Sequence, residues 1–311
     1  MTSHRNVDRP LGLGLQLPEV ERVVRWDEYQ VIALTAEDAG FDSLCVPDHL
    51  LYRDGDGTTQ GPWEAWSVVA ALTACTKTVH VGPFVAATSF ANPGILAKRA
   101  HTIDEIGGGR FFLGLGSGWN RAEYNAFGLP FDHLVSRFEE AFTIIRRLVR
   151  GEVVDFDGSY YHTDACELLP RSVNPHGGPP LMVGTMGSRM LQITLPHVEQ
   201  WNAWFGWFDN RVDRLGELLR QVDATCEDVG RDPSTLERTA AILVQAPGGT
   251  GRTVGDEDMS DAEPVSGSPA AVAESLVAFA DAGIGHAQIV LDPITLDALE
   301  WFAEVIEQLD A

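Results

Sequence analysis

Asp48 and His49 are the residues with the clearest capacity for acid–base chemistry, and they follow an apolar segment, "DSLCVP". Pro47 ends that segment because proline cannot donate to a sheet ladder. His49 is therefore expected on the following loop, where an imidazole that titrates near neutral pH can donate or accept a proton while a nearby carboxylate fixes its tautomer. A structural histidine without a catalytic role is the alternative.

The segment "LGLGSGWNRAEY", residues 113–124, has glycine at every second position. Residues two apart in a strand share a face, so Gly114, Gly116 and Gly118 leave one face without side chains. Two explanations remain open: a neighbouring strand or helix packs closely there, or a flat ring lies against the bare backbone. A dinucleotide-binding fingerprint does not fit, because its third glycine would fall at Trp119.

Asn120 and Glu123 follow the glycines with the spacing of a capping box. In that motif each side chain accepts a hydrogen bond from the other's backbone N–H at the start of a helix, and this interpretation is favoured for the pair. Trp119, directly after the glycine segment, is placed to form the wall of a ring pocket.

The charge balance excludes one large class of partner. The formal net charge is −23, and lysine occurs only at Lys77 and Lys98, so no basic stripe is available for nucleic acid. A bound phosphate must then rely on backbone N–H groups at a helix N-terminus and on a few arginines. The segment "VGTMGSRM" offers such a turn, although it also fits an ordinary strand-to-helix connection; its candidate residues are Gly184, Thr185, Gly187, Ser188 and Arg189.

The elements that must position these residues form a regular alternation. Apolar runs of strand length alternate with amphipathic stretches, such as the one-face pattern of Phe138, Phe142, Ile145 and Val149. About eight such pairs without an internal linker predict an α/β fold, a (β/α)8 TIM barrel, as a single domain over residues 1–311. The predicted strands begin at Leu11, Asp42, Val79, Arg110, Pro180, Val198, Thr239 and His286.

Two segments interrupt the alternation. Residues 151–179 contain an Asp157-Gly158 turn between β-prone runs and predict a small inserted hairpin. Residues 246–269 are polar and rich in glycine, which predicts a long mobile loop that could act as a lid.

Other features predict a cytoplasmic protein. No apolar run reaches the roughly 18 residues of a membrane span, and the first ten residues lack the apolar core of a signal peptide. The four cysteines are scattered without a metal-binding spacing, so they are expected to be reduced thiols and no metal site is indicated.

Several motifs in the same order resemble the luciferase-like monooxygenase family, in particular its F420-dependent and FMN-dependent oxidoreductases. The similarity extends over nearly the whole chain. The segments that carry it are "FDSLCVPDHL", "FANPGILAKRAHTIDEIGGGR", "GGRFFLGLGSGWNRAEYNAFGLPFDHLVSRFEEA", "PPLMVGTMGSRML", "WNAWFG" and "ADAGIGHAQIVLDP".

The resemblance implies a dimeric barrel with a flavin or deazaflavin across its C-terminal mouth. It places His49, with Asp48, near the reactive centre of the ring, and it favours phosphate at the Gly184–Arg189 turn. The residues it places against the ring are Ala86, Ala87 and Thr88 at a kink in the third strand, and Gly116, Ser117, Gly118, Trp119 and Asn120 after the fourth.

The implied function is an F420-dependent oxidoreductase that transfers a hydride between the reduced deazaflavin and a small organic substrate. Two alternatives are an FMN-dependent two-component monooxygenase that uses O2 and a separate reductase, and a flavin-binding protein without catalysis. The substrate is open, because Trp119, Trp201, Trp204 and Trp207 could line an aromatic cavity or belong to the core or a dimer contact.

Overall fold

The core of the structure is a ring of parallel strands. The computed structural model describes residues 9–53, 55, 57–172, 174, 177–252 and 262–311. In the main sheet every pairing is parallel, and the strand order is β5-β2-β1-β13-β12-β11-β10-β7-β6. The strands are β1 (Gly12–Gln16), β2 (Ser43–Val46), β5 (His80–Pro83), β6 (Ala86–Ala87), β7 (Leu113–Gly116), β10 (Leu181–Gly184), β11 (Gln200–Ala203), β12 (Glu237–Gln245) and β13 (His286–Asp292).

The third barrel strand is divided into β5 and β6, and this division closes the ring. β5 pairs with β2 on one side, whereas β6 pairs with β7 on the other. A bridge between Val81 and Phe111 joins the two edges. Phe84 and Val85 lie between the two parts and are joined by a cis peptide bond. Because β5 and β6 together make one barrel strand, the eight strands predicted from the sequence are confirmed.

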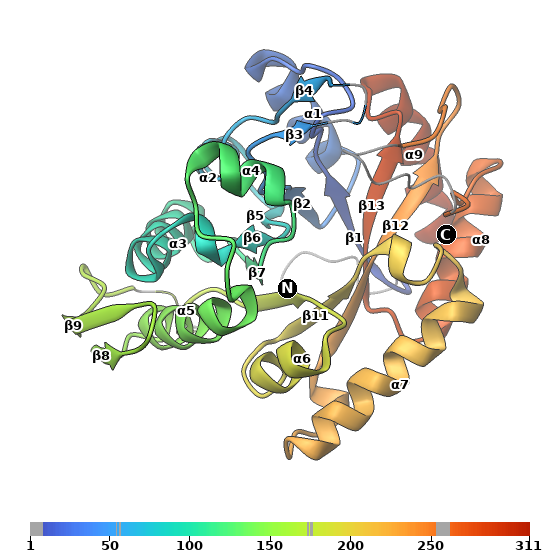
Figure 1. Ribbon diagram of the computed structural model, residues 1–311. Coiled ribbons are helices and arrows are strands. Elements are labelled where there is room, and N and C mark those ends of the chain that lie inside the picture. Colours follow the sequence, from blue (N-terminus) through green and yellow to red (C-terminus); the bar gives the residue numbers. More distant parts are fainter. Residues whose placement is uncertain (1–8, 54, 56, 173, 175–176, 253–261) are drawn as a thin grey trace.

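Helices cover the outside of the ring (Figure 1). The predicted apolar stripe of α5 is confirmed, because Phe138, Phe142, Ile145 and Val149 are all buried. The helices are α1 (Trp26–Asp38), α2 (Ala65–Cys75), α3 (Pro93–Gly107), α4 (Arg121–Phe127), α5 (Leu134–Val149), α6 (Ser188–Thr194), α7 (Val212–Asp228), α8 (Pro269–Asp281) and α9 (Leu296–Leu309).

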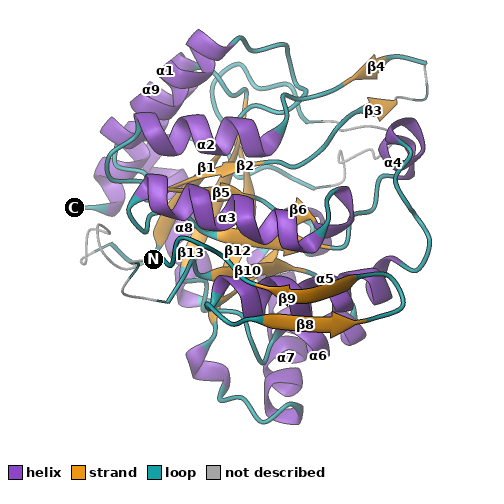
Figure 2. Cartoon of the chain, turned by 90° about the vertical axis from the view of Figure 1, so that its left-hand side faces the viewer, coloured by secondary structure: helices purple, strands orange, loops and turns teal. Residues whose placement is uncertain are grey.

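Two small hairpins lie outside the main sheet. The predicted one is present in the insertion as β8 (Val154–Asp157) and β9 (His162–Cys166), which lie beside α5 (Figure 2). The second, β3 (Tyr52–Arg53) with β4 (Thr59–Gln60), directly follows the Asp48-His49 loop, and the sequence pattern did not indicate it.

The segment predicted as a mobile loop, residues 246–269, includes residues 253–261, which lie outside the described residues. Its two described ends are held in place. Val265 forms a parallel bridge with Val244, and its N–H donates to Leu243 O at 2.9 Å. Arg252 at the other end is buried. Within the part of the chain that the structure describes, no helix is long and apolar enough to cross a membrane.

The glycine face of β7 is covered by the neighbouring strand. A Cβ on Gly114 would lie 2.4 Å from Pro83 O and 2.9 Å from Val85, and one on Gly116 would lie 2.9 Å from Val85. Gly118 has φ +79°, and a Cβ there would lie 1.9 Å from the Tyr124 hydroxyl. For Gly114 the structure supports close packing by the neighbouring strand, and the explanation that a flat ring lies against it is wrong. Gly116 is also packed against Val85, but it borders the cavity described below as well.

Gly114→Ala is expected to lower the free energy of unfolding by about 1–3 kcal/mol, because the new methyl group meets backbone that cannot move alone. Gly216→Ala is the matched control. It lies within α7, where a Cβ meets only Arg220 Nη1 at 3.5 Å, and it is expected to raise stability by up to about 1 kcal/mol. Urea denaturation of both variants measures the difference, and a Gly114→Ala protein as stable as the wild type would contradict the packing described.

Candidate active site

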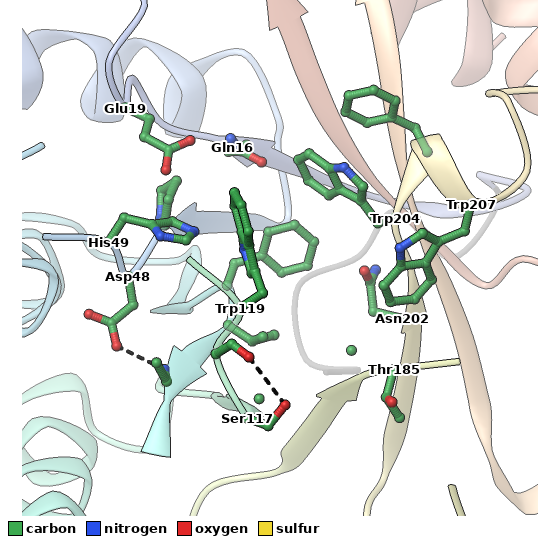
Figure 3. A pocket seen from close by; sticks show the side chains of 18 of the residues that line it. Gln16, Glu19, Asp48, His49, Ser117, Trp119, Thr185, Asn202, Trp204 and Trp207 are labelled. Carbon is green, nitrogen blue, oxygen red and sulfur yellow. Dashed lines mark hydrogen bonds between the residues drawn. The ribbon is translucent and has the colours of Figure 1, made fainter. Parts of the chain in front are cut away.

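A cavity of about 440 Å³ opens at the carboxyl ends of the barrel strands, which is where barrel enzymes carry their sites. It receives residues from β1, β6, β7, β10 and β11 and from the loops that follow them (Figure 3). Its described lining residues are Gln16, Glu19, Pro47, Asp48, His49, Tyr52, Phe84, Val85, Ala87, Gly116, Ser117, Gly118, Trp119, Glu123, Gly184, Thr185, Met186, Asn202, Trp204, Phe205, Trp207 and Arg252.

His49 is paired with a buried carboxylate. Its Nδ1 lies 3.1 Å from Glu123 Oε1 and 3.3 Å from Oε2, and Glu123 Oε2 also accepts from Leu50 N–H at 2.8 Å. The Glu123 side chain is 1% exposed, whereas that of His49 is 19% exposed. An ionised carboxylate only accepts, so Nδ1 carries the hydrogen and Nε2 is left to exchange a proton with a ligand.

The surroundings of His49 shift its pKa in opposing directions. Burial lowers the pKa, but the hydrogen bond to Glu123 and the charges of Glu19, Glu123 and Asp48 raise it, and the net pKa lies above the ordinary value of 6.5. The imidazolium is thus favoured at neutral pH more strongly than in an exposed histidine, which suits a group that donates a proton.

Asn120 is the N-cap of α4, but the two reciprocal bonds of the predicted capping box are not the ones that the structure has. Asn120 Oδ1 accepts from Ala122 N–H at 3.1 Å and so caps α4. Its Nδ2 donates to Leu51 O at 2.8 Å. Glu123 does not return to the Asn120 backbone, because its carboxylate faces His49 and Leu50 instead. The pair therefore attaches the start of α4 to the loop after β2.

Asp48 is also buried, but it has another partner. Its Oδ2 accepts from Ala87 N–H at 3.0 Å, which ties the end of β2 to β6 (Figure 3). Burial raises the pKa of Asp48 to about 7, and the charges of Glu64 and Glu123 add to this effect. The carboxylate that contacts the His49 ring is consequently Glu123, and Asp48 acts on it only through its charge.

Three aromatic rings meet beside the acid–base pair. The His49 ring centroid lies 4.9 Å from that of Tyr52 and 5.5 Å from that of Trp119. Tyr52 and Trp119 are 6.2 Å apart, and Trp119 remains 47% exposed. The prediction that Trp119 forms part of the pocket wall agrees with this position.

A buried ion cluster supports the outer side of these rings. The Tyr52 hydroxyl donates to Glu19 Oε1 at 2.7 Å, and Arg252 donates to Glu19 Oε2 and Glu21 Oε1, both at 2.9 Å. With the Gln16 amide turned so that its oxygen faces the guanidinium, Gln16 accepts from Arg252 at 2.8 and 3.1 Å. Arg252 therefore joins the segment after β12 to the segment after β1.

The opposite wall is aromatic. Trp204 and Trp207 border the cavity, whereas Trp201 is fully buried and donates from Nε1 to Thr185 O at 2.7 Å. Asn202 lies near them, and its Nδ2 donates to Thr239 Oγ1 and to Gln288 Oε1, both at 2.8 Å. Of the four tryptophans considered from the sequence, three converge on the cavity and one belongs to the core.

The structure brings nine of the predicted site residues to the cavity: Asp48, His49, Ala87, Gly116, Ser117, Gly118, Trp119, Gly184 and Thr185. The others are not among its lining residues. They are Ala86, Thr88, Asn120, Gly187, Ser188 and Arg189. The Thr88 hydroxyl donates to Gly116 O, Asn120 caps α4, and Gly187 and Ser188 lie at the N-terminus of α6. The Arg189 guanidinium pairs with Glu139 on the surface.

Sequence reasoning missed residues that act across long distances in the chain. Val85 stands where the ring of strands closes, directly before the predicted kink at Ala86, Ala87 and Thr88. Glu19 and Arg252 carry charge but no local motif that would separate them from surface residues, and the local motif that contains Glu123 indicated a helix cap instead of a contact with His49. A buried arginine in a loop of polar residues leaves no periodic signal, so only the three-dimensional arrangement identifies it.

Comparison with known proteins agrees with this geometry. A family model described as luciferase-like monooxygenase matches residues 12–247. The chain belongs to the luciferase-like monooxygenase family. The relatives and solved structures named below are a reductase, two dehydrogenases and a monooxygenase, and three of them are named with F420 or FMN.

Two curated relatives of this luciferase-like chain illustrate the range of activities among the proteins that it resembles. A 5,10-methylenetetrahydromethanopterin reductase of Archaeoglobus fulgidus is 30% identical over 170 residues, 55% of this chain and 47% of that protein. An F420-dependent hydroxymycolic acid dehydrogenase of Mycobacterium tuberculosis is 28% identical over 237 residues, 75% of this chain and 62% of that protein. The matched part thus spans about half to two thirds of these relatives.

Solved structures of both cofactor types share the fold. An F420-dependent secondary alcohol dehydrogenase, in complex with an F420-acetone adduct, has a TM-score of 0.79 at 19% identity, with 96% of this chain and 99% of that chain covered. The oxygenating constituent of 3,6-diketocamphane monooxygenase from Pseudomonas putida, in complex with FMN, has a TM-score of 0.73 at 17% identity, with 97% and 98% covered. At these identities the likeness establishes the fold alone.

The cavity of this luciferase-like chain fits a flat, mostly apolar ring. Ala87, Gly116 and Gly184, from three adjacent strands, border it with little side-chain volume, and Val85 stands over the glycines. A Cβ on Gly184 would meet Val85 at 3.7 Å, so a larger side chain there would take up cavity space. An extended tricyclic ring could lie against this surface with Nε2 of His49 at its edge.

Glu123→Gln is expected to lower the pKa of His49 from its raised value, because the hydrogen-bonded charge of Glu123 disappears while burial remains. A histidine with a raised pKa contributes stability that is present below pH 6.5 and is lost as pH rises through the folded pKa. The stability advantage of the wild type over the variant should therefore be largest in acid and shrink above neutrality.

Histidine NMR titration, together with denaturation at two pH values, measures both effects. The exposed His162, paired with Asp157 on the β8–β9 hairpin, serves as internal control because the substitution leaves its surroundings intact. If the pKa of His49 is the same in both proteins, Glu123 does not set it.

Proposed function

We propose that this enzyme is an F420-dependent oxidoreductase that transfers a hydride between the reduced deazaflavin and a small organic substrate. The observation that carries the proposal is the His49–Glu123 pair at the cavity, in which Nδ1 is engaged by the carboxylate and Nε2 is left to exchange a proton. Hydride transfer to a carbonyl carbon leaves an oxyanion, and a cationic imidazole at that place supplies the proton. The F420-dependent relatives named above add support.

The chain's own residues divide the work of such a reaction. Glu123 orients the His49 ring and favours its protonated form. Val85, Ala87 and Gly184 shape the surface against which the ring of the cofactor would lie. The bound deazaflavin supplies the hydride chemistry, and the protein supplies position, proton transfer and exclusion of water.

The place of the cofactor phosphate stays a prediction. Thr185 borders the cavity directly before α6, and its Oγ1 accepts from Gly187 N–H at 3.2 Å. Ser188 and Arg189 follow in the first turn of that helix. We place the phosphate at this end of the cavity, where backbone N–H groups compensate for the scarcity of lysine.

A homodimer is also part of the proposal. Ile95, Ile106 and Phe127 are each about half exposed and border a second hollow formed by α2, α3 and α4. Exposed apolar side chains gathered in one region favour contact with another protein surface. A light-scattering mass of twice the chain mass would agree with this arrangement, and the mass of one chain would refute it.

Titration of the apoprotein with F420 and, separately, with FMN tests the proposed function. Binding of F420 at micromolar or lower concentration without comparable binding of FMN is expected. Preference for FMN would replace the proposal by its alternative, an O2-using monooxygenase supplied by a separate flavin reductase, because a deazaflavin has carbon in place of the nitrogen that supports oxygen chemistry.

His49→Ala separates binding from catalysis. The variant is expected to keep F420 affinity within a few fold and to lower turnover by about 10²–10⁴-fold, the usual contribution of a positioned acid–base group. His162→Ala, on the exposed hairpin, is the control and should change neither. Full turnover in His49→Ala would remove this residue from the mechanism.

A further inference from the structure

The positive charges that border the active-site cavity are already compensated. Among its described lining residues the cationic side chains are Arg252 and His49. Arg252 is shared by Glu19 and Glu21, with N···O distances of 2.9 Å to each, and His49 is paired with Glu123. The remaining Nε–H of Arg252 is buried without accessible area. An anionic substrate would therefore find no unpaired cation there.

Negative charge is in excess at the same place. The lining includes the carboxyl groups of Glu19 and Glu123, and Arg252 pairs with Glu21 as well as with Glu19. The third lining carboxyl group, Asp48, has its pKa raised to about 7 by burial and so adds only part of a charge at neutral pH. The effect of these carboxyl groups reaches the neighbouring rings, because the charges of Glu19 and Glu123 raise the pKa of His49 against its burial. Burial first, and then the charge of Glu19, likewise raise the pKa of Tyr52. The cavity therefore disfavours a further negative charge and favours a positive one.

Aromatic faces supply the rest of the wall. Trp119 lies on one side of the cavity, and Trp204 and Trp207 lie on the other (Figure 3). Indole is the best of the aromatic faces for a cation, and it also accepts an apolar body. Since Trp119 is 47% exposed, part of its ring surface remains available to a ligand.

Asn202 adds a hydrogen-bond acceptor of fixed orientation. Both hydrogens of its amide are used, one by Thr239 Oγ1 and one by Gln288 Oε1. These two bonds determine which way the amide is turned, so Oδ1 faces away from them in a residue that borders the cavity. An N–H or O–H donor of a ligand can meet this oxygen.

We propose that the cavity takes organic cations of the amine class: an iminium ion that would accept the hydride at its carbon, and the amine formed from it, which would take its proton from His49. The apolar body lies against the indoles, and the cationic nitrogen or its N–H faces Asn202 Oδ1 and the surrounding carboxylates. The assignment of these ligands as substrate and product rests on the proposed function. The charge preference itself does not depend on which cofactor is bound. A neutral alcohol of the same shape binds less tightly, and a carboxylate least of all.

Three matched probes test the proposal: 3-phenylpropylamine, 3-phenylpropan-1-ol and 3-phenylpropanoate, which differ only in the terminal group. Each is titrated at neutral pH into protein saturated with F420 and into protein saturated with FMN, with indole fluorescence and thermal shift as readouts. The Kd of the amine is expected to be at least about tenfold below that of the carboxylate, which corresponds to about 1.4 kcal/mol. Equal affinities, a preference for the carboxylate, or no binding of the amine would overturn the proposal.

Glu19→Gln removes one carboxylate and frees part of the Arg252 charge, so it should reduce the amine-to-carboxylate preference at least threefold. Asp213→Asn removes a carboxylate from an exposed pair with Arg211 on α7 and should leave the preference unchanged. Trp119→Leu, at a half-exposed position, should weaken binding of the amine probe more than binding of the alcohol probe. The proposal would be contradicted if Trp119→Leu weakened binding of the amine and of the alcohol equally, or if Glu19→Gln left the ratio of amine to carboxylate affinity unchanged.

These outcomes are separate from the test of the cofactor. If FMN replaces F420, the hydride-transfer proposal fails while the amine preference still stands. If F420 binds and the carboxylate probe is preferred, the proposed function stands and the amine substrate is excluded.

Discussion

The active site depends on the contact between Glu123 and the loop after β2. A fully buried carboxylate is costly unless hydrogen bonds and an opposite charge compensate it, and here His49 Nδ1 and Leu50 N–H do so. The contact joins the first turn of α4, which follows β7, to the end of β2. The same bond that compensates the carboxylate therefore fixes the tautomer, the orientation and the charge of the imidazole at the cavity.

The packing of the barrel strands determines the shape of the cavity that the His49 imidazole borders. The interruption between β5 and β6 places Val85 over the glycine face of β7, so the neighbouring strand fills what would otherwise be an opening in the ring. Ala87, Gly116 and Gly184 then border the cavity with little volume. Small residues thus serve both the closure of the barrel and the room for a flat cofactor.

The sequence predicted the elements better than the contacts between them. Alternation of apolar strands and amphipathic helices is a local pattern, and Pro47 marked the end of β2, so the position of His49 on a loop could be derived. Glu123 could not be assigned, because its spacing from Asn120 fits a local cap as well as a contact 74 residues away. Arg252 and Glu19 are 233 residues apart, and their ion pair has no signature in either segment.

A crystal structure of the protein with F420 bound tests the central claim most directly, because that claim joins the His49–Glu123 pair to the cofactor in one cavity. The account predicts the deazaflavin ring against Val85, Ala87 and Gly184, with Nε2 of His49 facing its reactive edge and Nδ1 still bonded to Glu123. A ring bound elsewhere, such as the hollow between α2, α3 and α4, or a His49 turned away from it, would contradict the account.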